Sequence, residues 1–199
     1  MPTEPVRVFI PDPSYGGGSS LDLSDEEASL QFGRLLEEEY GSAFQPTSIG
    51  TGAALAALFT ELFSDPAAVA LALFFAGKPI KDGLEAWGSI YQRLTKFFHH
   101  NPTFDREGAA ILGYEAIVER LGGVPNSYQL TGFAIQNRLA EINPMKLPDP
   151  GELRTIEPAP DRVQAAAVYV FQVVADGMPF RFRVVGRDVE FLEPVGRKE

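Results

Sequence analysis

Residues 168–192, VYVFQVVADGMPFRFRVVGRDVEFL, decide the C-terminal part of the fold. Runs of β-branched and aromatic residues are divided by Asp176-Gly177 and Gly186-Arg187, and each pair fits a two-residue hairpin turn. Two such turns bring three consecutive strands side by side in antiparallel order. We therefore predict a three-stranded antiparallel β-meander within residues 161–195.

The register that these turns impose separates the two faces of the meander. Phe171 faces Phe182, and Phe182 in turn faces Phe191, so one face is continuously apolar. On the opposite face Arg183 lies across from Glu190. The apolar face needs a covering layer, and the last strand, at residues 189–192, should lie at a sheet edge.

Upstream of the meander the hydrophobic pattern is mainly helical. A β-branched run at residues 6–10 predicts an N-terminal strand. Apolar spacing and capping residues predict helices at residues 25–40, 52–63, 66–76, 79–98 and 105–121. Residues 127–138 fit either a strand or a helix, and we favour a strand because Gly132 interrupts them.

The predicted fold class is therefore α+β, with a helical layer of about five helices, an N-terminal strand and the C-terminal meander. We expect one domain over residues 1–199. Its helical portion covers about residues 1–142, and a Pro-rich connection at residues 143–160 leads into the meander.

The predicted helix 25–40 has two distinct faces. Ser24 and Glu27 form a capping box at its start. Its inner stripe is predicted to comprise Phe32, Leu35, Leu36 and Tyr40. Outside this stripe lie Glu37, Glu38 and Glu39, which we interpret as a solvated acidic face and a candidate partner surface.

The predicted helix 66–76 carries no polar face, since residues 67–76 are all apolar. A helix that is apolar all round is buried in a protein core or in a bilayer. A single membrane-spanning helix over residues 53–77 is not expected, because Glu61, Asp65 and Pro66 lie near its middle.

Composition and charge limit the classes of partner. The chain has 199 residues, 45% of them apolar, and a formal net charge of −10. Residues 1–50 hold nine acidic and two basic residues, and so carry −7 of that charge. Such a surface repels phosphate backbones, so we expect no nucleic-acid binding and favour a basic protein partner.

The absence of cysteine excludes disulfides, thiolate metal sites and cysteine nucleophiles. Residues 1–5 lack the basic and apolar regions of a secretory signal, so we expect a cytoplasmic protein. There is no GxSxG motif, and the two histidines, His99 and His100, are adjacent. We therefore favour a non-enzymatic function and predict no cofactor.

Two further groups of residues are candidate ligand sites. The loop Gly16, Gly17, Gly18, Ser19 and Ser20 lies between a strand and a helix, where backbone amides can bind phosphate. It lacks the GxGxxG spacing, so we favour a simple surface loop. We predict no metal site: His99 and His100 are the nearest candidates, but adjacent residues on a regular helix point about 100° apart, so chelation requires a break. We favour instead a helix C-terminus at which their partial positive charge complements the helix dipole.

The leading functional hypothesis is a protein-interaction or accessory module that uses the acidic N-terminal surface or an edge strand. The alternative is a membrane-acting effector whose apolar helices, residues 52–76, insert into lipid. A small-ligand pocket lined by Trp87, Tyr91, Phe171 and Phe182 is a third hypothesis, which sequence alone does not distinguish from core packing.

Overall fold

The computed structural model describes residues 5–14, 24–48, 56–137 and 167–192. Within these ranges the chain forms four α-helices, one short 3₁₀ helix and two four-stranded antiparallel sheets. The mixed α+β class is thus confirmed. The Pro-rich connection at residues 143–160 and the loop at residues 16–20 lie outside the described residues.

The first sheet, sheet A, is built mostly from the N-terminal third of the chain. Its strand order is β2-β3-β1-β4, and every neighbouring pair is antiparallel. The strands are β1 (Val6–Pro11), β2 (Gln45–Ser48), β3 (Ala56–Leu62) and β4 (Thr103–Phe104).

Sheet B contains the predicted meander and one strand more. Its order is β5-β6-β7-β8, formed by β5 (Tyr128–Asn137), β6 (Ala167–Ala175), β7 (Met178–Val185) and β8 (Asp188–Phe191). The ambiguous residues 127–138 are thus largely a strand, which pairs with β6. The sheet has four strands rather than the three predicted.

The predicted register of the meander is confirmed. Phe171 pairs with Phe182, and Phe182 pairs with Phe191. Arg183 lies opposite Glu190, and their side chains form an ion pair at 2.6 Å between Nη2 and Oε2. The turn residues thus determined the alignment of three strands.

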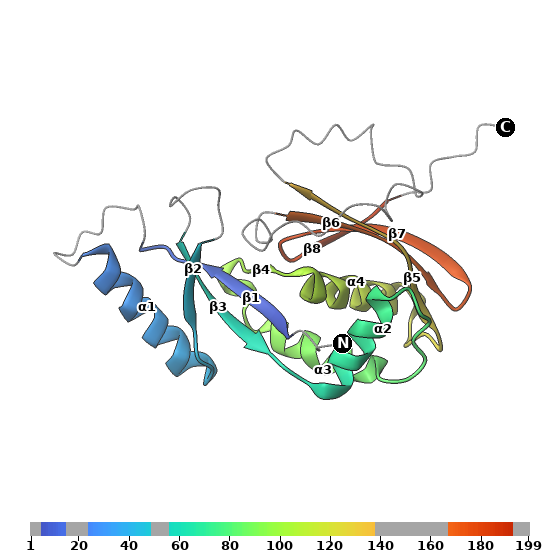
Figure 1. Cartoon of the computed structure of the whole chain (residues 1–199), viewed down its shortest axis with the longest axis horizontal. Coiled ribbons are helices and arrows are strands. Elements are labelled where there is room, and N and C mark those ends of the chain that lie inside the picture. The colour runs from blue at the N-terminus through green and yellow to red at the C-terminus, as the bar shows by residue number, and fades with distance from the viewer. Residues whose placement is uncertain (1–4, 15–23, 49–55, 138–166, 193–199) are drawn as a thin grey trace.

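Four α-helices pack against the sheets: α1 (Asp25–Tyr40), α2 (Asp65–Phe75), α3 (Leu84–Thr95) and α4 (Arg106–Leu121). A short 3₁₀ helix, η1, spans Phe98–His100. In the view of Figure 1, α2, α3 and α4 lie below sheet B, whereas α1 lies at the far end of the molecule beyond β2 and β3. One continuous apolar core joins both sheets to these helices.

The helix predicted at residues 52–63 is wrong where the structure describes it. Residues 56–62 form β3, which pairs with β1 on one side and β2 on the other. Leu55, Leu58, Phe59 and Leu62 suggested a helical period, but a short apolar run is also typical of a strand enclosed between two neighbours. The number of α-helices in the described residues is therefore four, not five.

Two helix faces also differ from prediction. In α2, Val69 and Leu73 are 54% and 37% exposed, so this helix is not buried all round. In α1, Leu35 is 60% exposed, because the inner stripe follows Phe32, Leu36 and Tyr40 at intervals of four residues. The predicted helix 79–98 is shorter, since Gly83 adopts a left-handed conformation (φ 85°) just before α3.

The tightest contact between layers joins α4 to sheet B. A Cβ atom on Gly113 would lie 2.0 Å from Cε2 of Phe182, so only glycine lets the ring approach the helix backbone. Phe182 is fully buried, and its ring stacks on Phe171 with centroids 5.2 Å apart. This contact therefore fixes the spacing of helix and sheet.

We expect Gly113→Ala to destabilise the protein by at least about 2 kcal/mol, because the new methyl group forces α4 away from the Phe182 ring. Urea unfolding followed by circular dichroism measures the change. Gly33→Ala on α1 is the matched control: its Cβ would meet Leu58 at an ordinary 3.7 Å, and alanine favours the helix by about 1 kcal/mol. Equal effects of the two substitutions would contradict this account of the α4 contact.

Candidate functional site

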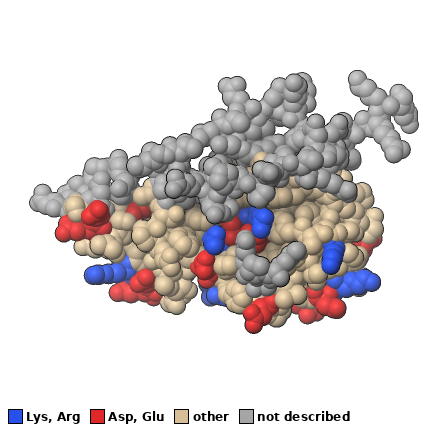
Figure 2. Space-filling view, in the orientation of Figure 1, with Lys and Arg blue, Asp and Glu red and all other residues tan. Residues whose placement is uncertain are grey.

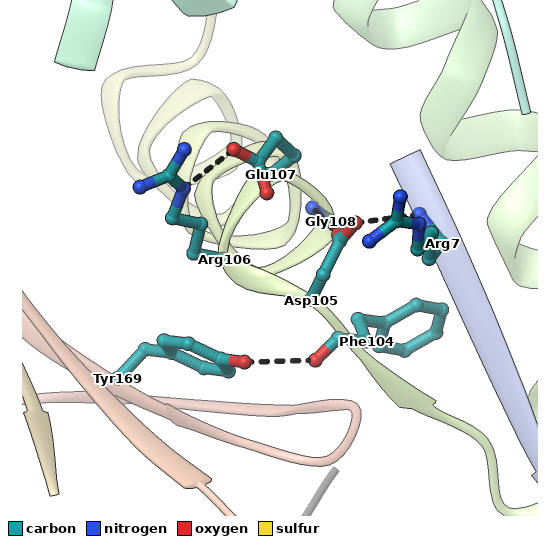
Figure 3. Close-up of polar contacts among 7 residues, drawn as sticks. All are labelled: Arg7, Phe104, Asp105, Arg106, Glu107, Gly108 and Tyr169. Atoms are coloured by element: carbon teal, nitrogen blue, oxygen red, sulfur yellow. Dashed lines mark hydrogen bonds and ion pairs between the residues drawn. The ribbon is translucent and has the colours of Figure 1, made fainter. Parts of the chain in front are cut away.

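A buried polar junction lies at the start of α4 (Figure 3). Asp105 caps this helix: its Oδ1 accepts a hydrogen bond from the Gly108 amide at 2.8 Å. Its Oδ2 accepts from the backbone amide of Arg7 in β1 at 2.7 Å. Asp105 is only 3% exposed, so one buried carboxylate both begins α4 and fastens it to sheet A.

Further contacts extend the junction to sheet B. The Tyr169 hydroxyl of β6 donates to the Phe104 carbonyl of β4 at 3.2 Å. Glu107 is 5% exposed, and its Oε1 lies 2.6 Å from Nε of Arg106. The Arg106 guanidinium also lies over the ring of Phe75, 5.0 Å from its centroid. Backbone groups of sheet A and side chains of sheet B and α2 thus converge on the start of α4.

Burial perturbs the acid–base properties of this junction. Removal from water, followed by the nearby charge of Glu107, raises the pKa of Asp105 well above its usual range. Burial also raises the pKa of Tyr169. Perturbed carboxyl groups are typical of active sites, but acid–base chemistry also requires space for a substrate.

Two surface hollows among the described residues have no lining residue from this junction. One, of about 260 Å³, lies between α3, η1, α4 and β8, and the other, of about 330 Å³, lies beside β2 and β3. They are lined by Tyr91, Phe98, Leu112, Ala116, Glu119, Arg187, Asp188 and Val189, and by Ser42, Ala43, Gln45, Phe59, Thr60 and Glu61. We therefore interpret the junction as structural.

The hypothesis of an aromatic ligand pocket is not supported by the geometry of the described residues. Trp87, Phe171 and Phe182 are fully buried in the main core. The Trp87 ring packs edge-on against Phe74 at 5.4 Å between centroids. Of the four predicted lining residues, Tyr91 alone borders one of the two hollows.

The three candidate partner residues on α1 have different environments. The Oε1 of Glu37 accepts a hydrogen bond from the Phe44 amide at 3.1 Å. Glu39 faces the two histidines. Glu38 is exposed and makes no hydrogen bond or ion pair with the described residues. The glutamates therefore do not form one surface, although they are consecutive in sequence.

His99 and His100 are brought together with Glu39. The Nε2 of His99 lies 3.2 Å from Oε1 of Glu39, and Nε2 of His100 lies 3.6 Å from Oε2. The regular helix α3 has ended at Thr95, and η1 turns both imidazoles toward α1. The break that chelation requires is thus present, and Glu39 is the partner that sequence reasoning did not assign to the histidines.

Tyr40 completes this cluster. Its hydroxyl lies 3.3 Å from the Lys96 carbonyl and 3.2 Å from Nε2 of His99. A hydrogen bond from Tyr40, with smaller contributions from His100 and His99, lowers the pKa of Glu39, while burial raises the pKa of Tyr40. Glu39 is therefore held as a carboxylate beside two imidazoles.

Comparison with known proteins adds no homologue. No protein-family model, curated protein or solved structure matches the chain. Within the described ranges, every helix is too short or too polar to cross a bilayer. The geometry of the site itself is therefore the evidence for its function.

We expect Asp105→Ala to lower the free energy of unfolding by about 2–4 kcal/mol, because it removes a helix cap and leaves the Arg7 amide without its acceptor. Chemical denaturation measures this loss. Ser64→Ala is the matched control, since Ser64 precedes α2 without making a side-chain capping bond, and it should cost about 0.5 kcal/mol or less. Comparable losses at the two positions would show that the junction contributes nothing beyond ordinary helix capping.

Proposed function

We propose that this protein is a non-enzymatic interaction module that binds a basic, amphipathic segment of a partner protein through the outer face of α1. The observation that carries the proposal is the exposure of Leu30 and Leu35, at 64% and 60%, on a strongly acidic helix. Exposed apolar surface rimmed by polar residues is typical of interaction sites.

The charge of α1 favours a basic partner. Its sequence, DEEASLQFGRLLEEEY, contains six acidic residues and one arginine. Figure 2 shows acidic side chains toward both ends of the region where Figure 1 places α1, with a basic group between them. Complementary charge speeds encounter and orients the partner, while apolar contacts supply most of the affinity.

The two leucines set the geometry of this face. Leu35 lies five positions after Leu30, so the two are about 7.5 Å apart along the helix axis and about 140° apart around it. Between them runs a polar strip that includes Arg34 and Glu38, both exposed. A partner helix lying along the strip would place apolar residues on either leucine and basic residues against Glu38.

The edge strand β8 is a weaker candidate than α1 for the partner-binding surface. It has only four residues, and short edge strands limit pairing with another chain. The Arg120 guanidinium also lies 4.6 Å from the centroid of the Phe191 ring, so this strand is partly engaged by α4. We therefore place the partner on α1.

The test uses a synthetic helical peptide with leucines on one face and lysines on the other, titrated by fluorescence anisotropy. We expect Leu30→Gln combined with Leu35→Gln to weaken binding about tenfold, or ~1.4 kcal/mol, and Glu38→Lys to weaken it about threefold. Glutamine retains helix propensity, so loss of the helix does not explain the change.

Two variants elsewhere on the surface are matched controls for this experiment. Val124→Ser removes an apolar side chain that is 56% exposed, and Glu85→Lys reverses an exposed charge on α3. Both should bind the peptide as wild type does. If the controls weaken binding as much as the α1 variants, the peptide recognises net charge alone and the proposal fails.

The alternative is a shallow membrane contact through α2, favoured by the exposure of Phe63, Val69 and Leu73 at 49%, 54% and 37%. With 11 residues α2 extends about 16 Å, roughly half of a ~30 Å hydrocarbon core, so it would lie along the surface. The two helices predicted within residues 52–76 do not form a hairpin, because residues 56–62 are the strand β3.

Co-sedimentation with phosphatidylcholine vesicles, with and without anionic lipid, separates the two functions. The interaction proposal expects the wild-type protein to stay in the supernatant with both kinds of vesicle. Sedimentation that is abolished by Val69→Gln with Leu73→Gln, and retained by the α1 variants, would favour the membrane alternative instead.

A further inference from the structure

The cluster of Glu39, His99 and His100 has the spacing of a metal site. One ligand atom from each residue can be chosen so that all three lie within 4.8 Å of one another. Zinc binds nitrogen and oxygen ligands at about 2.0–2.1 Å, so neighbouring ligand atoms in a tetrahedron are about 3.3–3.4 Å apart. The Glu39 carboxylate approaches both imidazoles closely: Oε1 lies 3.2 Å from Nε2 of His99, and Oε2 lies 3.6 Å from Nε2 of His100.

A second observation independently points to a ligand. The Nε2 atom of His100 is buried and makes no hydrogen bond of ordinary length with the described residues. A buried polar atom without a partner is costly, and proteins rarely leave one without a ligand, ion or water. The nearest Glu39 oxygen, at 3.6 Å, is positioned for a shared ion rather than for a direct hydrogen bond.

We propose that Glu39, His99 and His100 bind a divalent transition-metal ion, with Zn²⁺ as the best match. Two imidazole nitrogens and one carboxylate oxygen form a donor set that suits zinc and its first-row neighbours. The His99 side chain is 57% exposed, so the remaining coordination position opens to water. The Tyr40 hydroxyl, 3.2 Å from Nε2 of His99, borders the site.

The ion would strengthen the contact between α1 and η1, where the Tyr40 ring already lies near both His99 and His100. Glu39 belongs to the last turn of α1, whereas both histidines belong to η1. Leu36 is the one fully buried side chain in the described part of α1. A metal joining α1 to η1 would therefore hold the helix on the body of the protein. The site does not require α1 to bind a partner.

The sequence makes the test unusually clean, because the chain contains no cysteine and no histidine besides these two. Full-length protein freed of any histidine tag and treated with a chelator is titrated with Zn²⁺ by calorimetry. Hydrogen exchange of the α1 amides, with and without Zn²⁺, is the second readout. We expect one ion per chain, and slower exchange in α1 when it is bound.

The variants separate coordination from a simple ion pair. Glu39→Gln and His100→Ala should each weaken Zn²⁺ binding at least about tenfold and abolish the change in exchange. Glu38→Gln, one position earlier on α1, should bind as wild type does, and Glu39→Gln preserves side-chain size if His100→Ala fails to fold. Absence of saturable binding by wild type, or equal affinity in Glu39→Gln, would overturn the site and leave a metal-free ion pair.

Discussion

The rest of the structure depends on the direct contact between the α4 backbone and the ring of Phe182. Phe182 lies in the third strand of sheet B, stacked on Phe171 and 6.1 Å from Phe191 between ring centroids. Gly113 lets this ring approach the α4 backbone, where a Cβ atom would collide with it. Because protein interiors are close-packed, this contact fixes the distance between α4 and sheet B. The other core side chains must then fill the remaining space between them.

The junction at Asp105 then sets the relation of sheet A to this unit. A buried carboxylate is costly unless its oxygens accept hydrogen bonds, and here two backbone amides from different elements satisfy both oxygens. Removal from water and the nearby charge of Glu107 raise the pKa of Asp105, while these two hydrogen bonds act in the opposite direction. A group with the acid–base character of a catalytic residue therefore serves to join β1 to α4.

Short-range signals predicted much of this fold. The turns at residues 176–177 and 186–187 fixed the register of β6, β7 and β8 without any tertiary information, because turn geometry and strand alternation are local properties. The predicted capping box at Ser24 and Glu27 likewise placed the start of α1.

The sequence did not reveal sheet A beyond β1. Leu58 and Leu62 lie on one face of β3 and are spaced by four residues, which fits a strand and a helix equally well. Only the pairing of β3 with β1 and β2, a long-range property, distinguishes the two. The same limit applies to the metal cluster, because nothing local connects Glu39 with His99 across 60 positions of chain.

The placement of α1 explains why the candidate functions gather there. Functional elements are commonly drawn from the less stable parts of a fold, since binding and ordering need groups that the core does not use. In α1 a single leucine, Leu36, is fully buried, while Leu30 and Leu35 face solvent.

The three consecutive glutamates of α1 have different neighbours. Glu37 accepts a hydrogen bond from the loop that follows the helix, Glu38 faces solvent, and Glu39 contacts the histidines. A run of like charges in a sequence is therefore not one surface, because successive residues turn by about 100° around the helix. We propose Glu38 as a contact for a partner and Glu39 as a ligand for an ion, and each proposal can fail without the other.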